Sequence, residues 1–177
     1  MSKGLLPWRF SVLLACFLAV TVQSKAVANE PGLSAQEVVR RYSRSVACQI
    51  ALASDGWLQY ASLELESGQP ESGVGAVWLV GWTGDLGCMG GNGTQGLQMT
   101  LVAQNGFSRY AVSPVVIDAN PMPDLLMNGL RGLSVHDGVV TIVGTRGRLA
   151  VGSITPVTER YRWRGLWVSG PRFERLP

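Results

Sequence analysis

The chain has few of the residues that most often carry out enzymatic chemistry. Its 177 residues include one histidine, His136, and three cysteines. Histidine is the usual general base near neutral pH, and the alternation of the flanking sequence predicts that His136 points outward from a hairpin turn. The sequence also contains no Gly-x-Ser-x-Gly nucleophile elbow, no phosphate-binding loop and no zinc-type cysteine spacing. The sequence therefore predicts no catalytic residue, no metal ligand and no cofactor.

No apolar run is long enough to cross a membrane as a helix. The longest, Phe10–Val22, has 13 residues, whereas a spanning helix needs roughly 20. Two basic residues precede this run, and the small residues Ala26–Ala28 follow it, which is the order found in a secretory signal peptide. We therefore expect residues 1–28 to be cleaved and residues 29–177 to form a single β-rich domain, with no transmembrane span after processing.

Two alternatives to this cleavage remain open. Val22-Gln23-Ser24 is a second acceptable cleavage site, and Leu13–Cys16 has the form of a short lipobox that would leave the protein lipid-anchored at Cys16. The residues after Cys16 continue the apolar run, whereas a lipidated cysteine is normally followed by a polar tether. The sequence favours a soluble periplasmic or secreted protein.

Lysine is absent after residue 25, and the positive charge of the whole chain disappears with the signal segment. The formal net charge is +3, and the first 28 residues carry three basic residues and no acidic one. The remaining chain then has 12 arginines and 12 acidic residues. A net charge of zero excludes general attraction to nucleic acid. Residues 131–177 nevertheless contain eight arginines and three acidic residues, which indicates a locally basic half.

Two cysteines remain after cleavage, Cys48 and Cys88. An even number of cysteines in an exported chain is typical of a disulfide, because the compartment is oxidising. We expect one Cys48–Cys88 bridge that holds the glycine-rich segment 84–96.

The first element of the mature chain is predicted to be a helix. Ser34 and Glu37 form a capping box, and Leu33 and Val38 have the spacing of a hydrophobic staple. Apolar residues then recur at helical spacing, so the helix should run from about Ala35 to Ser45 and cover one side of a sheet.

Beyond Val46 the apolar period changes from 3.6 to 2, and tight-turn dipeptides separate the strand-like runs. Trp78-Leu79-Val80 is apolar on both faces, which indicates a strand buried between the helix and a second layer. The pattern predicts a mainly β (α+β) fold, an antiparallel curved sheet or sandwich with one N-terminal helix and one disulfide. The predicted hairpins pair Val46–Ala53 with Trp57–Leu65, Leu97–Gln104 with Phe107–Val116, and Leu133–His136 with Val139–Gly144; further strands are Val74–Trp82, Glu159–Trp163 and Leu166–Ser169.

Two acidic groups could carry chemistry. Glu64 and Glu66 are expected about 7 Å apart on one strand face, a separation that also suits paired catalytic carboxylates, but the amphipathic pattern favours a solvated face. The run Asp118–Asp124 offers oxygen ligands, yet it lacks the turn glycine and the distal glutamate of a calcium loop. Neither group is predicted to be a site.

The strongest candidate binding surface is a row of three arginines. Strand alternation sends Arg160, Arg162 and Arg164 to one face and the aromatic residues between them to the other. Guanidinium groups bind carboxylates and phosphates in bidentate fashion, so the row suits an acidic protein or an anionic cell-envelope polymer. The alternative is that Glu64 and Glu66 neutralise the row across the strands. Five tryptophans of the mature chain are expected mainly in the core, with a sugar-stacking platform as the alternative.

The segments Val135–Thr145 and Val157–Trp163 resemble the closing strands of uncharacterised bacterial exported and lipoprotein β-domains. This resemblance implies a bacterial envelope setting and no particular activity. The sequence as a whole favours an exported envelope binding or interaction module of unknown partner over an enzyme. The alternatives are an inhibitor or immunity-type protein directed against an envelope hydrolase and a small periplasmic hydrolase.

The cleavage site is directly testable. Because Ala26–Ala28 follows a short apolar run, the exported protein should begin at Asn29. Intact-mass measurement of protein recovered from the exporting cell checks this. A mass that retains residues 1–28, or a diacylglycerol adduct on Cys16, would contradict the expectation.

Overall fold

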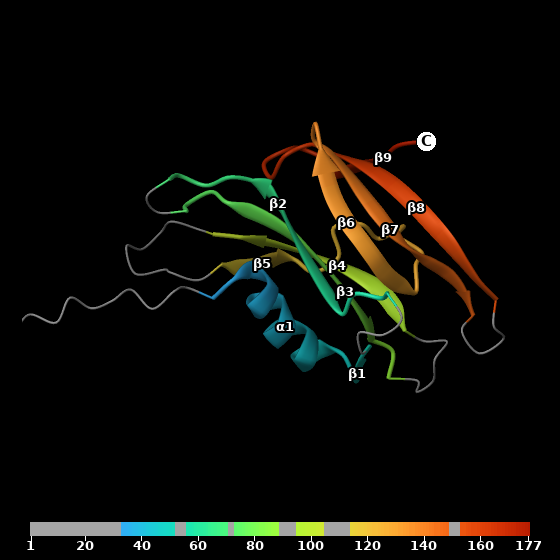
Figure 1. Cartoon of the computed structure of the whole chain (residues 1–177). Coiled ribbons are helices and arrows are strands. Elements are labelled where there is room, and N and C mark those ends of the chain that lie inside the picture. The colour runs from blue at the N-terminus through green and yellow to red at the C-terminus, as the bar shows by residue number, and fades with distance from the viewer. Residues whose placement is uncertain (1–32, 52–55, 71–72, 89–94, 105–113, 149–152) are drawn as a thin grey trace, which may run out of the picture. The chain divides into compact units, whose positions relative to one another are not determined.

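The computed structural model describes residues 33–51, 56–70, 73–88, 95–104, 114–148 and 153–177, all within the unit Pro31–Pro177. These residues form one helix and nine strands (Figure 1). The elements in chain order are α1 (Ala35–Val46), β1 (Gln49–Ile50), β2 (Tyr60–Glu66), β3 (Val77–Asp85), β4 (Gly96–Ala103), β5 (Val115–Asp118), β6 (Gly129–His136), β7 (Val139–Arg148), β8 (Ser153–Trp163) and β9 (Phe173–Arg175).

The helix begins where the capping box predicted. The Ser34 side chain accepts a hydrogen bond of 3.2 Å from the Glu37 amide. The Glu37 carboxylate, expected to reach back to Ser34, instead accepts from the guanidinium groups of Arg40 and Arg41. These hydrogen bonds, first that from Arg40, lower the pKa of Glu37 to about 2. The helix ends at Val46, one residue beyond the predicted end.

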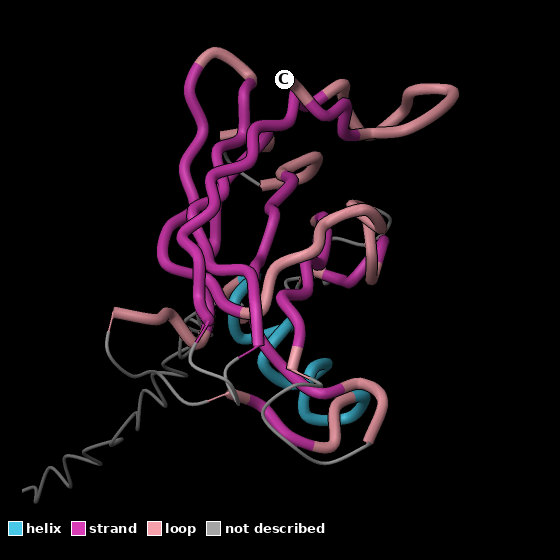
Figure 2. The backbone as a smooth tube through the Cα atoms, turned by 90° about the vertical axis from the view of Figure 1, so that its right-hand side faces the viewer, coloured by secondary structure: helices cyan, strands magenta, loops and turns pink. Residues whose placement is uncertain are grey.

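The strands form two antiparallel sheets. In the first sheet the order is β1-β3-β4-β5, and β2 lies beside β1 along the same edge of β3. In the second sheet the order is β6-β7-β8-β9, so each strand pairs with the next in the chain. A bridge between Leu58 and Leu130 links the two sheets at the β2 and β6 edges. Figure 2 shows α1 at the end of this unit away from the C-terminus. The mainly β prediction is confirmed.

Two apolar layers hold these elements together, and β3 contributes to both. Leu79 packs between the sheets with Leu101 and Ile142. Val80 and Trp82 face the opposite way and pack against the helix. The prediction that Trp78–Val80 lies between the helix and a second layer is therefore correct.

One predicted hairpin is wrong. Val46–Ala53 does not pair with Trp57–Leu65: Gln49 lies opposite Asp85 and Tyr60 lies opposite Trp82, so both segments pair with β3. Alternation indicates that a segment is a strand but does not name its partner, and β3 is the strand whose edge and two apolar faces most need cover. Residues 52–55, with the Asp55 turn position, lie outside the described residues.

The remaining strand predictions differ in their details. At Asp137 and Gly138 φ is +49° and +72°, as a type I′ hairpin requires, and β6 and β7 extend beyond the predicted bounds. β4 pairs antiparallel with β5 as expected, but Ala103 lies opposite Val115, so the predicted strand Phe107–Val116 overlaps β5 only at its last two residues and the register of a tight turn at Asn105 is wrong. Residues 105–113 lie outside the described residues. The predicted strand Leu166–Ser169 is wrong, because the closing strand is β9 at Phe173–Arg175.

Cys48 and Cys88 form the expected disulfide, with their Cα atoms 5.3 Å apart. The bridge joins the residue before β1 to the segment after β3. The Cys48 amide also donates to the Asp85 carbonyl, which fixes the same corner through the main chain.

The disulfide should contribute measurably to stability. It closes a loop of 40 residues, for which the chain-entropy treatment gives about 3 to 4 kcal/mol. The double variant Cys48→Ala, Cys88→Ala should therefore unfold at a clearly lower urea concentration than the wild type. Unchanged unfolding, or two titratable thiols in freshly exported protein, would show that the bridge has no such role.

Candidate binding site

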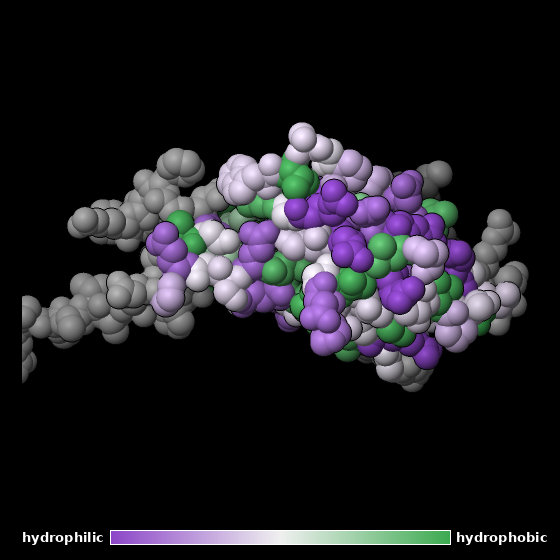
Figure 3. Space-filling model, turned by 90° about the horizontal axis from the view of Figure 1, so that it is seen from above, coloured by the Kyte–Doolittle hydropathy of each residue, from purple (hydrophilic) through white to green (hydrophobic). Residues whose placement is uncertain are grey.

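The second sheet presents the predicted arginine row on its outer face. Glu159 and Tyr161 are buried between the sheets, so Arg160 and Arg162 point outward, and Arg164 follows directly after the end of β8. Figure 3, seen from the side on which Figure 1 places this sheet, shows a mixed surface with many hydrophilic side chains. The outward placement predicted by alternation is correct for Arg160 and Arg162, whereas Arg164 lies beyond the strand and lines a cavity described below.

The three arginines differ in their contacts. Arg160 donates to the Pro177 carbonyl at 2.8 Å, and Arg164 forms an ion pair with Glu174 at 2.8 Å. Arg162 lies between them, opposite Glu174 in the register of β8 and β9, and forms no ion pair with a residue in the described part of the chain. Arg162 therefore offers its guanidinium group to solvent.

The alternative that Glu64 and Glu66 neutralise this row is wrong. A register shift in β2 places Glu64 opposite Trp78 and Glu66 opposite Val77, and these two β3 residues face different layers. The Glu66 carboxylate accepts from the Trp163 indole at 2.8 Å, and Glu64 accepts from the Ser67 hydroxyl. The two carboxylates consequently do not share a face.

Among the described residues, the loop between β8 and β9 carries the most exposed large hydrophobic side chain. Trp167 is 89% exposed, and the neighbouring Val168 is 38% exposed. The expectation that tryptophans fill the core holds for Trp82 and fails for Trp167. The apolar run Leu166–Val168 gave the sequence signal of a strand, whereas positive φ at Gly165 and Gly170 turns the chain into a loop. A large exposed aromatic side chain is typical of a binding surface.

This loop is anchored at its base. Arg172 donates to the Leu166 carbonyl at 3.3 Å and forms an ion pair of 2.7 Å with Asp118 at the end of β5. The Arg164 amide donates to the Arg172 carbonyl at 2.9 Å. These contacts tie the loop to the first sheet, so Trp167 is presented from a held segment.

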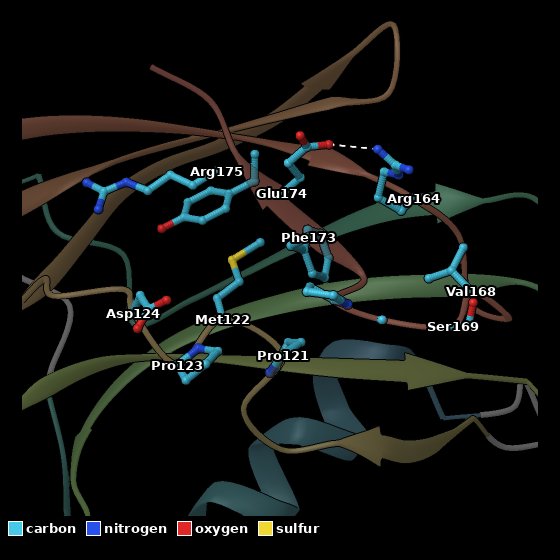
Figure 4. A pocket seen from close by; sticks show the side chains of 13 residues that line it. Pro121, Met122, Pro123, Asp124, Arg164, Val168, Ser169, Phe173, Glu174 and Arg175 are labelled. Atoms are coloured by element: carbon cyan, nitrogen blue, oxygen red, sulfur yellow. Dashed lines mark hydrogen bonds and ion pairs between the residues drawn. The ribbon is translucent and has the colours of Figure 1, made fainter.

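A cavity of about 500 Å³ lies beside the same loop (Figure 4). It is bounded by the connection between β5 and β6, by the end of β8, and by β9 with the loop before it. Met122 and Phe173 lie at its centre, Arg164 and Arg175 lie on two sides, and Asp124 lies on the wall opposite Glu174. The lining residues are Pro121, Met122, Pro123, Asp124, Tyr161, Arg164, Val168, Ser169, Gly170, Pro171, Phe173, Glu174 and Arg175. The sequence signals did not bring these segments together.

A buried carboxylate supports one wall of the cavity. Glu159 accepts from Arg146 at 2.7 Å and from the Tyr161 hydroxyl at 2.6 Å, and Arg175 Nη2 lies 3.1 Å from the same carboxylate. Burial, together with the hydrogen bond to Glu159, raises the pKa of Tyr161 above its ordinary range. Two guanidinium groups share the Glu159 carboxylate, so Arg175 is only partly neutralised. The cavity lining itself contains two arginines, Arg164 and Arg175, and two carboxylates, Asp124 and Glu174.

The other sequence candidates carry no constellation of reactive groups. The His136 side chain is 92% exposed at the hairpin turn, next to Asp137. Asp118, the first residue of the proposed calcium run, pairs with Arg172. Among the described residues no three or more His, Cys, Asp or Glu side chains gather as a metal site would require.

Comparison with known proteins finds no matching family model, and no curated protein or solved structure is significantly similar to the chain. Within the described ranges, no helix has the length and apolar character needed to cross a membrane. The binding surface therefore has to be interpreted from its own residues.

Tyr161 gives a measurable test of the Glu159 cluster. Because the folded state raises the pKa of Tyr161, its contribution to stability is present below about pH 10 and is lost as the pH rises toward the folded-state pKa. In absorbance titrations at 295 nm, the difference between wild type and Tyr161→Phe should appear well above pH 10. Tyr42→Phe is the control for the same chemical change elsewhere. A difference that titrates at the ordinary tyrosine pKa would refute the buried cluster.

Proposed function

We propose that this chain is an exported binding module that recognises an acidic protein partner. The observation that carries the proposal is the exposure of Trp167, 89% of its surface, on an anchored loop that follows Arg164, the last residue of the row Arg160, Arg162 and Arg164. Tryptophan and arginine are the residues most enriched at binding hot spots. An exposed tryptophan offers a large apolar contact area at small entropic cost.

A protein partner fits this surface better than a uniformly anionic polymer. Arg162 has no ion pair among the described residues and can bind a carboxylate of the partner directly. Trp167 and Val168 need an apolar surface against which to lose water, and a protein supplies carboxylates and apolar side chains together. The experiment below distinguishes a protein partner from an anionic envelope polymer.

Export rests on the signal-like first 28 residues, and the Cys48–Cys88 disulfide is in keeping with an oxidising compartment. The bacterial envelope setting rests on the resemblance of the C-terminal strands. A small exported module whose exposed surface offers an aromatic side chain and arginines would also suit an inhibitor of an envelope hydrolase.

The arginine row is tested by replacing Arg160, Arg162 and Arg164 with Gln. Capture of a partner from envelope extract should weaken, and its salt dependence should flatten, because the electrostatic contribution is removed. The melting temperature should change little, since exposed ion pairs contribute about 0 to 1 kcal/mol each. The matched control replaces Arg40, Arg41 and Arg44 of α1 with Gln, which removes the same charge from the helix.

The captured protein is identified, purified and titrated directly against wild type, the arginine triple variant and Trp167→Ser. Trp167→Ser should lower affinity about tenfold or more at both low and high salt. Identical affinities and salt profiles for wild type and the arginine variant would overturn the proposal. If a protein-free fraction of envelope polymer competes with the captured protein for binding, the ligand is an envelope polymer and not a protein.

A further inference from the structure

We propose that the cavity around Met122 and Phe173 is an anchor pocket for one large apolar side chain of the partner, flanked in the partner's sequence by carboxylates. This inference rests on the proposed function and adds to it the motif that is recognised. The motif is an apolar residue with acidic neighbours, presented by a peptide segment of the partner.

The size and lining of the cavity suit an apolar side chain. Its volume of about 500 Å³ accommodates a large side chain together with its backbone. Met122 and Phe173 form the interior, and Pro121, Pro123 and Val168 add apolar walls. Methionine adapts its shape to different apolar partners, so the pocket can accept a leucine, a phenylalanine or a tryptophan.

The walls are already held in place without a ligand. The Arg172–Asp118 ion pair joins the residue before β9 to the end of β5, just before the lining segment Pro121–Asp124. Phe173 packs against Trp163, with ring centroids 4.8 Å apart. On the third side, the Tyr161 hydroxyl is bonded to Glu159. A preformed pocket lowers the entropic cost of binding.

The charges around the cavity give the peptide a polarity. Arg175 and Arg164 lie on two sides of the interior (Figure 4). Arg175 shares Glu159 with Arg146 and is only partly neutralised, whereas Arg164 is paired with Glu174. Asp124 lies on the opposite wall and repels a carboxylate there. We therefore expect the partner's flanking carboxylates to lie near Arg175 and Arg164 and away from Asp124.

Trp167 precedes Val168 in the chain, and Val168 lines the cavity. Trp167 is not among the residues that line the cavity, and its side chain is 89% exposed, so it offers the partner further apolar contact area from the same loop.

The probe is a synthetic fluorescein-labelled peptide, Ac-Gly-Asp-Asp-Phe-Asp-Asp-Gly-NH2, with two matched peptides that carry Ala for Phe or Asn for every Asp. In fluorescence anisotropy titrations, the Phe peptide should bind at least about tenfold more tightly than the Ala peptide, because a full aromatic side chain is buried. In proton–carbon NMR spectra the Met122 and Val168 methyl signals should shift on saturation.

The pocket is then blocked without touching the core. Ser169 is exposed and lines the cavity, so Ser169→Trp should fill it and make the Phe and Ala peptides bind equally. Ser45→Trp is the matched control, because it adds the same side chain at an exposed position of α1. This variant should still bind the Phe peptide more tightly than the Ala peptide. Val168→Asp is a second variant that should repel the acidic peptides. Melting temperatures establish that each variant is folded.

The possible outcomes separate the pocket from the proposed function. Equal binding of the Phe and Ala peptides to the wild type, or a Phe preference that survives Ser169→Trp, overturns the pocket. If those acidic peptides still lose affinity when Arg162 is replaced by Gln, the acidic-partner proposal stands without the pocket. If the Asn peptide binds as tightly as the Phe peptide that carries Asp, the flanking carboxylates are not part of the recognised motif. No saturable binding and no methyl shift with any peptide at millimolar concentration also overturns the pocket, while capture from envelope extract independently decides the partner.

Discussion

Strand β3 is the element on which the rest of the structure depends, because it is apolar on both faces. One face supplies Val77 and Leu79 to the layer between the sheets, and the other supplies Val80 and Trp82 to the layer under the helix. A strand with two apolar faces must be covered on both sides. The helix provides one cover and the second sheet provides the other, and β1 and β2 together occupy the edge of β3 that β4 leaves free.

The two sheets are joined by different interactions on their two sides. On the β2 and β6 side, a main-chain bridge between Leu58 and Leu130 links them. On the β5 and β9 side the link is the side-chain ion pair of Asp118 with Arg172. A side-chain link leaves more space than main-chain pairing, and the cavity around Met122 and Phe173 lies at this side (Figure 4). The cavity thus follows from the way in which the sandwich is closed.

The arginines of the C-terminal half include those that pair with carboxylates and Arg162, which forms no ion pair among the described residues. Arg146 and Arg175 compensate the buried Glu159 carboxylate, and Arg172 joins the sheets. Arg162 has no ion pair among the described residues and is exposed. A buried carboxylate must be paired, whereas a guanidinium group at the surface is well solvated by itself. The charge asymmetry of the sequence therefore reflects, in part, the compensation of Glu159 and Asp118 in the fold.

The sequence by itself determined those features that depend on near neighbours in the chain. The Ser34 cap, the hairpin at Asp137 and Gly138, and the outward position of Arg162 follow from local hydrogen bonding, turn geometry and the two-residue period of a strand. The disulfide was also predictable, because only one pairing of two cysteines is possible.

Only the tertiary structure decided which distant segments meet. It paired β1 with β3, placed Glu66 against Trp163, and left Trp167 exposed where its apolar neighbours indicated a strand. It also formed the cavity from segments more than 30 residues apart, since Met122 lies in the connection between β5 and β6 and Phe173 lies in β9. These contacts depend on burying apolar area between whole sheets, a quantity that no local pattern in the chain encodes.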